Sequence, residues 1–475
     1  MRKRVMVIGL DCLEPALALD RFADDMPNLW RIAGGARGRL LSIRPPITCP
    51  AWMCAFTGRD PGQLGVYGFR NRAGWDYGPL RLTFSDGLPT ENAPAVWDLA
   101  GQAQLHSIVI GVPPGYPPRR VRGEFIGCFL TPGPESPFAY PPELAEETAA
   151  VVGEYRFDVS NARDTNRQRT LDEIHEMTEK RWRLARHLLD TRAWDLFVMV
   201  EIGTDRMHHA FWQFSDPQHV LYAPNSPFAE AIRDYYRLID RQIGTLIERA
   251  DDDTLILCVS DHGAQRMDGG FFLNEWLMAK GYLALKGQPV RPGPLRSEQI
   301  DWGATIAWGD GGYYGRIFLN VAGREPLGTV TPERVPEVRS ALAEALRAEA
   351  LPWGQPGVAN RVFIPSEIYR ETKGFPPDLI LYPGDLYWRA LGSLPSHAGE
   401  FFTKENDTGP DGANHAPYGV FAAISGQDLH RGTGPARALS DLRLVDLAPT
   451  IAAHLNLRMP DDIVGRAIDP ALWGE

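Results

Sequence analysis

The most informative residues of this sequence are a threonine and a set of aspartates and histidines that could together hold metal ions. A threonine hydroxyl is inert at neutral pH and becomes a nucleophile only when a base or a metal ion activates it. Mixed carboxylate and imidazole ligands favour zinc or another borderline transition metal over magnesium, which prefers oxygen. The candidate metal ligands are Asp11, Thr48, Asp205, His209, Asp261, His262 and His415.

These side chains are enough to bind two divalent metal ions, with Thr48 as the candidate catalytic nucleophile. Two ions about 4 Å apart can activate an attacking oxygen and stabilise the oxygens of a phosphoryl group in transfer. Zinc is the metal that the ligand types favour most, and manganese and iron are alternatives. The residues therefore predict phosphoryl transfer from a small-molecule phosphate ester, with no separate general base needed beside Thr48.

Asp11 and the Asp261-His262 pair each follow an apolar run directly. An aspartate in that position could simply cap the next helix, since Asp is a preferred N-cap residue. Two ligand types side by side at the end of a strand nevertheless favour a metal site. Cys12 is not expected among the ligands, because in an extended backbone it would point away from Asp11.

Asp205, His209 and His415 form the second part of the set. Asp205 and His209 are four residues apart, so that a helix would place both side chains on one face, where they could share one ion. His208 is the neighbour of His209, and the spacing from Asp205 favours His209. His397 competes with His415, but it lacks the glycine and the apolar strand that follow His415.

Buried strands alternating with amphipathic helices are predicted to position these residues. Two segments, 170–189 and 231–247, space their apolar residues at the period of a helix. The strands are predicted from apolar runs bounded by turn residues. These runs are Val5–Leu10, Ser107–Val112, Leu196–Ile202, Thr254–Ser260 and Gly419–Ala423.

Alternating strands and helices are typical of a mainly parallel sheet covered by helices, so the fold class is predicted to be α/β. Asp11, Asp205 and Asp261 each lie at or just past the C-terminal end of a predicted strand, where open parallel sheets bind ligands. We expect a catalytic metal-binding core made of residues 1–263 and 406–475. Residues 264–405 are expected to form an insertion or cap that contributes to the substrate pocket.

The composition argues for a folded enzyme that acts on small molecules. A formal net charge of -11 disfavours nucleic acid and anionic membranes as partners. Five cysteines without a CxxC pair suggest reduced thiols and a cytoplasmic location. The apolar run after Met1 is too short for a signal peptide, and no run is long enough to cross a bilayer. The composition leaves the oligomeric state open.

Six motifs in this order resemble the alkaline phosphatase superfamily, and within it the type I phosphodiesterase/nucleotide pyrophosphatase branch and its phosphohydrolase/phosphomutase relatives. The resemblance runs almost from end to end. Any one motif alone would be a weak signal. The matching pieces are Asp11 after its strand, Thr48-x-Pro50 with Thr57-Gly58, Asp205-x-x-x-His209, Asp261-His262-Gly263, His415-x-x-x-Gly419, and Asp446 to Thr450 with Pro460 and Gly465.

The resemblance implies an α/β/α sandwich that holds two metal ions and forms a phospho-Thr48 intermediate. Water would hydrolyse this intermediate in a phosphate mono- or diesterase. Two alternatives stay open: a phosphomutase or phosphoryl transferase that uses the same site, and a metal-stabilised binding protein without turnover. The implied ligands are Asp11, Thr48, Asp261 and His262 for one ion, and Asp205, His209 and His415 for the other.

Two departures from related enzymes concern the substrate. Sulfatase relatives carry a cysteine at the position of Thr48 and an arginine at that of Trp52, so sulfate ester hydrolysis is not expected. Nucleotide-cleaving relatives place an asparagine where this chain has Phe69, and Asn71 is a candidate substitute. The candidate substrate-binding residues are Phe69, Arg70, Asn71, His208 and Trp212.

Overall fold

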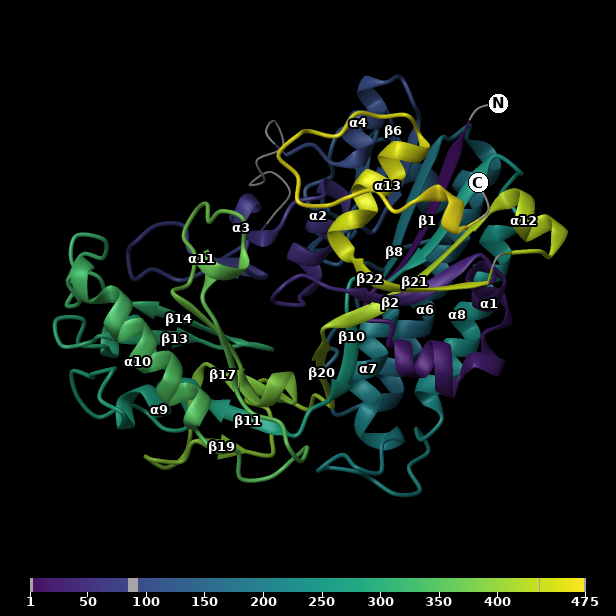
Figure 1. Ribbon diagram of the computed structural model, residues 1–475. Helices are drawn as coiled ribbons and strands as arrows, with labels where there is room; N and C mark the ends of the chain where they lie inside the picture. Colours follow the sequence, from purple (N-terminus) through teal and green to yellow (C-terminus); the bar gives the residue numbers. More distant parts are fainter. Residues whose placement is uncertain (1–2, 84–92, 435, 474–475) are drawn as a thin grey trace.

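The computed structural model describes residues 3–83, 93–434 and 436–473, and within them a nine-stranded sheet forms the centre of the larger of two lobes (Figure 1). Its inner strands are parallel, whereas β21 runs antiparallel to both of its neighbours. From one edge to the other the order is β22 (Arg437–Arg443), β2 (Ala36–Leu41), β21 (Tyr418–Ser425), β9 (Thr254–Val259), β1 (Arg4–Leu10), β8 (Leu196–Glu201), β5 (Ser107–Ile110), β6 (Gly123–Ile126) and β7 (Ala139–Tyr140).

The register of the central strands brings the ligand segments together. β1 pairs with β8 on one side and β9 on the other, so that Leu10 lies beside Glu201 and Gly9 beside Val259. The chain therefore leaves these three strands at one edge of the sheet, just before Asp11, the Asp205 segment and Asp261.

Helices cover both faces of the sheet, because side chains of a buried strand point alternately to opposite sides. On β1, Met6 and Ile8 enter one hydrophobic cluster, whereas Val5 and Val7 enter the other. The first cluster includes residues of α1 (Pro27–Ala33), α5 (Leu144–Val152), α6 (Arg167–Thr191), α7 (Gly203–Ser215), α8 (Ala231–Ile247) and α12 (Gly426–Arg431). The second includes residues of α2 (Thr48–Thr57), α3 (Pro61–Leu64), α4 (Val96–Gln102) and α13 (Leu447–His454).

The smaller lobe, residues 269–403, has its own sheets and its own hydrophobic core (Figure 1). One sheet has the order β13 (Ala307–Asp310), β14 (Gly315–Leu319), β16 (Leu379–Tyr382) and β15 (Arg361–Phe363). Another has the order β17 (Trp388–Leu391), β11 (Gly269–Phe272) and β19 (Phe402–Thr403), and β12 (Gly293–Pro294) pairs with β18 (Ser393–Leu394). The helices are α9 (Leu273–Ala279), α10 (Val335–Ala348) and α11 (Pro365–Ile368).

The contacts between the lobes include two pairs of short strands. β10 (Gly263–Arg266) pairs with β20 (Ala413–Ala416), and Figure 1 shows both strands between the lobes. A hairpin of β3 (Arg70–Asn71) and β4 (Arg81–Leu82) extends from the larger lobe, and the ring of Tyr77 within it stacks on Trp302 with 3.8 Å between centroids.

No helix within residues 3–83, 93–434 and 436–473 combines the length and the apolar character needed to cross a membrane.

Candidate metal centre and active site

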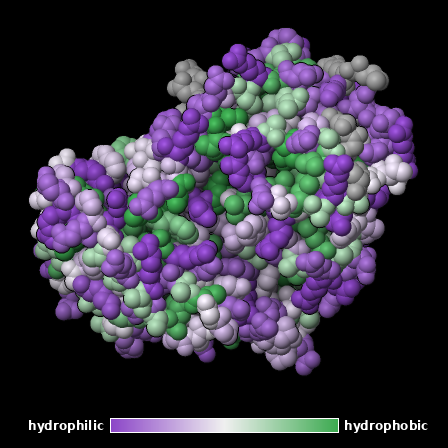
Figure 2. Space-filling view, in the orientation of Figure 1, coloured by the Kyte–Doolittle hydropathy of each residue, from purple (hydrophilic) through white to green (hydrophobic). Residues whose placement is uncertain are grey.

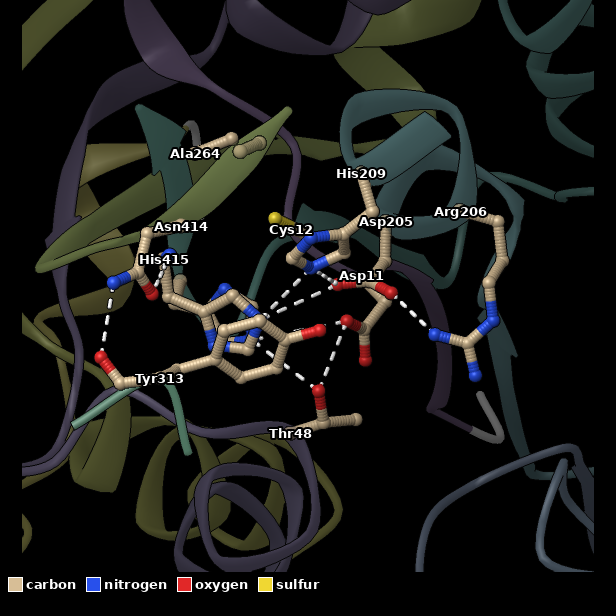
Figure 3. A network of polar contacts seen from close by, with 12 residues as sticks. Asp11, Cys12, Thr48, Asp205, Arg206, His209, Ala264, Tyr313, Asn414 and His415 are labelled. Atoms are coloured by element: carbon tan, nitrogen blue, oxygen red, sulfur yellow. Dashed lines mark hydrogen bonds and ion pairs between the residues drawn. The ribbon is translucent and has the colours of Figure 1, made fainter. Parts of the chain in front are cut away.

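Thr48 is the first residue of α2, a helix whose side chains are all buried. Ile47 before it is extended, which turns the chain into the helix directly beside Asp11. The Thr48 hydroxyl donates to Asp11 Oδ1 at 3.3 Å and lies 3.3 Å from His262 Nε2 (Figure 3). The hydroxyl is therefore fixed between a carboxylate and an imidazole.

Thr48, Asp11, Asp261 and His262 converge on one point. Besides its contact with Thr48, His262 Nε2 lies 3.2 Å from Asp261 Oδ2 and 3.8 Å from Asp11 Oδ1. Ligands about 2.0–2.2 Å from one tetrahedral ion lie about 3.3–3.6 Å from each other. The spacing of these four groups fits a single ion.

Asp205, His209 and His415 converge on a second point. Asp205 and His209 lie one turn apart on α7, with 3.2 Å between Asp205 Oδ1 and His209 Nε2. His415 Nε2, from β20, lies 3.2 Å from His209 Nε2 and 3.5 Å from Asp205 Oδ1. The structure thus brings all seven predicted ligands together in two adjacent groups, and the helix predicted from the Asp205 spacing is present.

In Asp205 and in Asp261, one carboxylate oxygen accepts a hydrogen bond from the protein and the other has no partner among the described residues. Asp205 Oδ2 accepts from Arg206 at 2.5 Å, and Asp261 Oδ1 accepts from the Cys12 N–H at 3.1 Å. The other oxygens, Asp205 Oδ1 and Asp261 Oδ2, are buried and have no hydrogen-bond partner among the described residues. Leaving such an oxygen unpaired is costly, and a cation at the centre would compensate both.

The three imidazoles present the same nitrogen to the centre. Each Nδ1 faces a protein acceptor, so its proton belongs there and Nε2 keeps a lone pair for a cation. The acceptors are Asp411 Oδ1 at 2.8 Å from His209, the Pro46 carbonyl at 2.8 Å from His415 and the Gly263 carbonyl at 3.1 Å from His262.

The electrostatics of the centre also favour cations. Burial raises the pKa of Asp11 and of Asp261 well above the ordinary range, and each is raised further by neighbouring carboxylates. Burial lowers the pKa of both His262 and His415, so these rings are neutral. The pKa of His209, in contrast, is raised against the effect of burial, mainly by the carboxylate of Asp411. Asp11 and Asp261 crowd negative charge beside the neutral ring of His262, and a divalent ion would supply positive charge there. The donor set and its geometry therefore fit two divalent metals.

A cleft of about 1160 Å³ opens from Thr48, Asp205 and His415 towards the smaller lobe. Phe69 and Arg70 line it, as expected of substrate-binding residues. The space-filling view shows hydrophobic residues, in green, gathered among hydrophilic ones where the two lobes meet (Figure 2). The cleft is large enough for a small-molecule ester.

The other three candidate substrate-binding residues lie outside the described wall of the cleft. The Asn71 amide is held in its own turn, where it accepts from the Tyr67 N–H at 2.7 Å. His208 is buried with its Nε2 at 3.0 Å from the Tyr236 hydroxyl, and burial lowers its pKa to about 3. Trp212 donates to Asp216 at 3.1 Å. Each of these side chains is occupied within the larger lobe.

His397 and Cys12, the two residues not expected among the metal ligands, lie in different parts of the structure. His397, the competitor of His415, is exposed on the smaller lobe. The expectation of an extended backbone at Cys12 is wrong: Cys12 has φ 63°, in the left-handed region. Its thiol donates to the Gly263 carbonyl at 3.3 Å and lies within 4.8 Å of ring nitrogens of His262 and His415.

Tyr313, Arg206 and Asp411 contact the candidate ligands but are not among the predicted site residues. The Tyr313 ring stacks on His415 at 4.3 Å and on His209 at 4.8 Å between centroids (Figure 3). Arg206 donates to Asp158 through two nitrogens, both at 2.7 Å. Two of the missed residues had a usable signal: Arg206 is adjacent to Asp205, and Asp411, the partner of His209, precedes His415 by four residues.

The fold resembles solved structures of a phosphonoacetate hydrolase and of ectonucleotide pyrophosphatase/phosphodiesterases at low sequence identity. Phosphonoacetate hydrolase from Sinorhizobium meliloti 1021, in complex with phosphonoformate, has a TM-score of 0.59 and 16% identity, with 96% of each chain covered. Human ectonucleotide pyrophosphatase/phosphodiesterase 5 has a TM-score of 0.51 and 14% identity, with 98% of this chain and 97% of that chain covered. The inactive murine form of that enzyme, in complex with AMP, has a TM-score of 0.52 and 14% identity, with 97% of this chain and 96% of that chain covered.

These likenesses confirm an alkaline-phosphatase-like α/β fold with a mainly parallel sheet. A search of curated proteins found no match. The sequence model of the family described as type I phosphodiesterase / nucleotide pyrophosphatase matches residues 5–411, which is most of the chain. The chain therefore belongs to the type I phosphodiesterase / nucleotide pyrophosphatase family, whose members are phosphoric ester hydrolases.

Proposed function

We propose that this protein is a metal-dependent phosphohydrolase that cleaves phosphate mono- or diesters of a small molecule through a phospho-threonine intermediate on Thr48. One observation carries the proposal. The Thr48 hydroxyl lies 3.3 Å from both Asp11 Oδ1 and His262 Nε2, and the same residue lines the cleft.

Asp11, Thr48, Asp261 and His262 would hold one ion, and Asp205, His209 and His415 the other. The ligand types favour zinc, with manganese or iron as alternatives. When bound, the ions supply positive charge that lowers the pKa of the Thr48 hydroxyl and stabilises the charge of the phosphoryl group.

The chain's own groups orient the reaction. Thr48 presents Oγ1 to the cleft while its proton points to Asp11 Oδ1. Attack on phosphorus forms the bond from Oγ1 to phosphorus and breaks the bond to the leaving oxygen. The Thr48 proton passes to solvent in the cleft, and the leaving oxygen takes a proton from solvent as it departs with the rest of the substrate. Because Thr48 begins α2, the positive end of this helix faces the transferred phosphoryl group. Water then attacks phosphorus and breaks its bond to Oγ1, which restores the Thr48 hydroxyl and releases phosphate from a monoester substrate or a phosphate monoester from a diester substrate.

We assign residues 1–263 and 406–475 to the catalytic core and 264–405 to a cap that contributes to the substrate pocket. The lining of the cleft by Phe272, Tyr313 and Arg389 supports this assignment. All five cysteines, each within the described residues, are buried free thiols, which supports a reducing compartment such as the cytoplasm.

The test is turnover of aryl phosphate monoesters and diesters by zinc- and manganese-loaded protein, compared with Thr48→Ala and Thr48→Ser. We expect Thr48→Ala to lose at least about 1000-fold in kcat and Thr48→Ser to keep part of it, because the hydroxyl is the nucleophile. Acid quench during turnover should trap phosphate on the peptide that contains Thr48.

Two results would change the proposal. Undiminished turnover by Thr48→Ala would exclude the threonine mechanism. A single burst of leaving group, with phosphate retained on Thr48 until an alcohol is added, would identify a phosphoryl transferase or mutase instead.

A further inference from the structure

The carboxylate of Asp411 is shared by three cationic or hydrogen-bonding groups at the inner end of the cleft. Asp411 is buried and accepts from His209 Nδ1 at 2.8 Å. Its other oxygen accepts from Arg163 Nε at 3.0 Å and from Arg389 Nη1 at 3.3 Å. One negative charge therefore faces two permanently charged guanidinium groups, which leaves an excess of positive charge.

Arg389 has spare donors. Only 9% of its side chain is exposed, yet its Nε has no hydrogen-bond partner among the described residues. Its Nη2 makes no hydrogen bond within that part of the chain either, and unlike Nε it is not closed off from solvent. The bond to Asp411 is thus the one ion pair of this guanidinium that the described residues supply.

The other arginines of the cleft are differently placed. Arg206 is bound to Asp158 and Asp205, and Arg316 is bound to Asp310 and to the Arg70 carbonyl. The remaining acids of the cleft wall form no ion pair with Arg163 or Arg389 within the described residues. They are Asp310, Glu400, Glu405 and Asp407. Arg70 also lines the cleft and forms no ion pair within the described residues, but it is exposed, so solvent can screen its charge. The unmatched charge that is shielded from solvent therefore belongs to Arg389 and its neighbour Arg163.

Tyr313 links this pair to the reacting centre. The Arg389 guanidinium carbon lies 4.8 Å from the centroid of the Tyr313 ring, whose hydroxyl accepts from Arg163 at 2.9 Å. The same ring stacks on His415. An anionic group held by Arg389 would consequently be one aromatic ring away from the phosphoryl site, within reach of a short linker.

We infer that the substrate carries a second anionic group on its leaving-group side and that Arg389, assisted by Arg163, binds it. The inference rests on the proposed function, which places the phosphoryl group at Thr48. A guanidinium presents a planar fork of donors that matches a carboxylate or a phosphoryl group. A buried guanidinium without a full counter-charge is costly, and the second anion of the substrate offsets that cost.

Three ligands of matched length test the inference on zinc-loaded protein by calorimetry. Propylphosphonate has one anionic group, 3-phosphonopropionate adds a carboxylate, and 1,2-ethylenediphosphonate adds a phosphoryl group. We expect wild type to bind at least one of the two doubly anionic ligands about 30-fold or more tighter than propylphosphonate. The one that is preferred identifies the second group.

Arg389→Gln should remove this preference while binding propylphosphonate within about threefold of wild type, because Arg163 still pairs with Asp411, and Asp411 still holds His209. Arg389→Lys should restore part of it. Arg361→Gln is the matched control, since Arg361 is a well-exposed arginine of the smaller lobe that pairs with Asp385. It should keep the full preference.

Equal binding of all three ligands by wild type would overturn the inference without recourse to any variant. A preference that survives in Arg389→Gln would overturn it too. Turnover of 4-nitrophenyl phosphate by the same preparations separates the two proposals: turnover without a preference rejects the second-anion site alone, and a preference lost in Arg389→Gln without turnover rejects the hydrolase proposal alone.

Discussion

Asp411 would affect the proposed metal centre without being one of its ligands. Its carboxylate fixes the tautomer and the orientation of His209, and it is itself held by two arginines. Such carboxylate partners of ligating histidines typically change metal affinity by 10–100-fold when they are lost.

We therefore predict that Asp411→Asn weakens binding of one of two zinc ions by about 10–100-fold, because the amide removes the negative charge behind His209. Competition with a chromogenic chelator would measure it. Asp252→Asn is a suitable comparison, since Asp252 also pairs with a histidine, His430, and both side chains are exposed. Unchanged affinity in Asp411→Asn would show that His209 needs no support from this carboxylate.

At the scale of elements, α7 carries two of the candidate ligands, and its first residue fits against α8. A Cβ added at Gly203 would lie 1.9 Å from the Tyr235 hydroxyl, which is too close for either group to remain in place. The N–H of Gly203 also donates to the buried Glu201 carboxylate at 2.8 Å. The start of α7 is thus tightly constrained.

Gly203→Ala should accordingly destabilise the protein by about 1–3 kcal/mol and shift α7, with loss of metal affinity at Asp205 and His209. Gly101→Ala in α4 is the matched control, because its Cβ would meet Arg122 at an ordinary 3.4 Å. There we expect a gain of about 0.5–1 kcal/mol, the usual benefit of alanine in a helix. Urea unfolding would measure the free energy of unfolding of both variants. Equal stability in the two would contradict the packing explanation.

His219 ties the loop after α7 to the segment that carries Asp411. Its Nε2 donates to the Gly412 carbonyl at 3.0 Å and its Nδ1 accepts from the Leu221 N–H at 3.0 Å, an arrangement that only the neutral ring can make. Burial lowers its pKa below the ordinary 6.5.

Because the folded pKa of His219 is depressed, its stabilising effect is complete above about pH 6.5 and is lost as the pH falls below it. We predict that the stability difference between wild type and His219→Gln shrinks by about 1 kcal/mol between pH 8 and pH 5. Denaturant midpoints at the two pH values measure it, and common titrations of other groups cancel in the difference. A constant difference would mean that His219 does not titrate with unfolding.

The central strands could be predicted from the sequence because each is a continuous apolar run, as β8 and β9 are. β2 and β22 could not. β2 carries Arg37 and Arg39, and β22 at the edge of the sheet buries only Leu442 among its described side chains. Their pairing depends on the rest of the sheet and not on their own composition.

The candidate ligands and the residues that line the cleft also differ in how far the sequence predicts them. The proximity of Asp11, Asp261 and His262 could be predicted because they follow strand ends, and that of Asp205 and His209 because they share a helix face, and both are local patterns. Tyr313, Arg163 and Arg389 come from segments that meet only after the lobes pack, and no spacing in the sequence relates them. Asn71 is the opposite case: its position in the sequence suggested substrate binding, but its side chain is hydrogen-bonded within its own turn.

At the scale of the whole molecule, the candidate ligands tie together segments that are hundreds of residues apart, whereas the described part of the smaller lobe supplies none of them. Bound ions would therefore act as cross-links within the larger lobe. Ligands that bind only the folded state stabilise it by about 4 kcal/mol when present at 1000 times their dissociation constant.

We predict that removal of metal by dipicolinate lowers the melting temperature and that zinc restores it, whereas magnesium does not, given its preference for oxygen ligands. Hydrogen exchange should rise in β1, α7 and β20 but not in α10, which packs in the separate core of the smaller lobe. Uniform loss of protection across both lobes would show that the lobes unfold as one unit.

The stacking of Tyr313 on His209 and His415 has a consequence for how such enzymes diversify. Tyr313 belongs to the smaller lobe and lines the cleft, and its ring packs on the imidazoles of two candidate ligands. Exchange of this lobe between relatives by recombination would transfer substrate preference and metal tuning together. Under the proposed function, a substitution at Tyr313 would therefore change substrate preference and metal binding together.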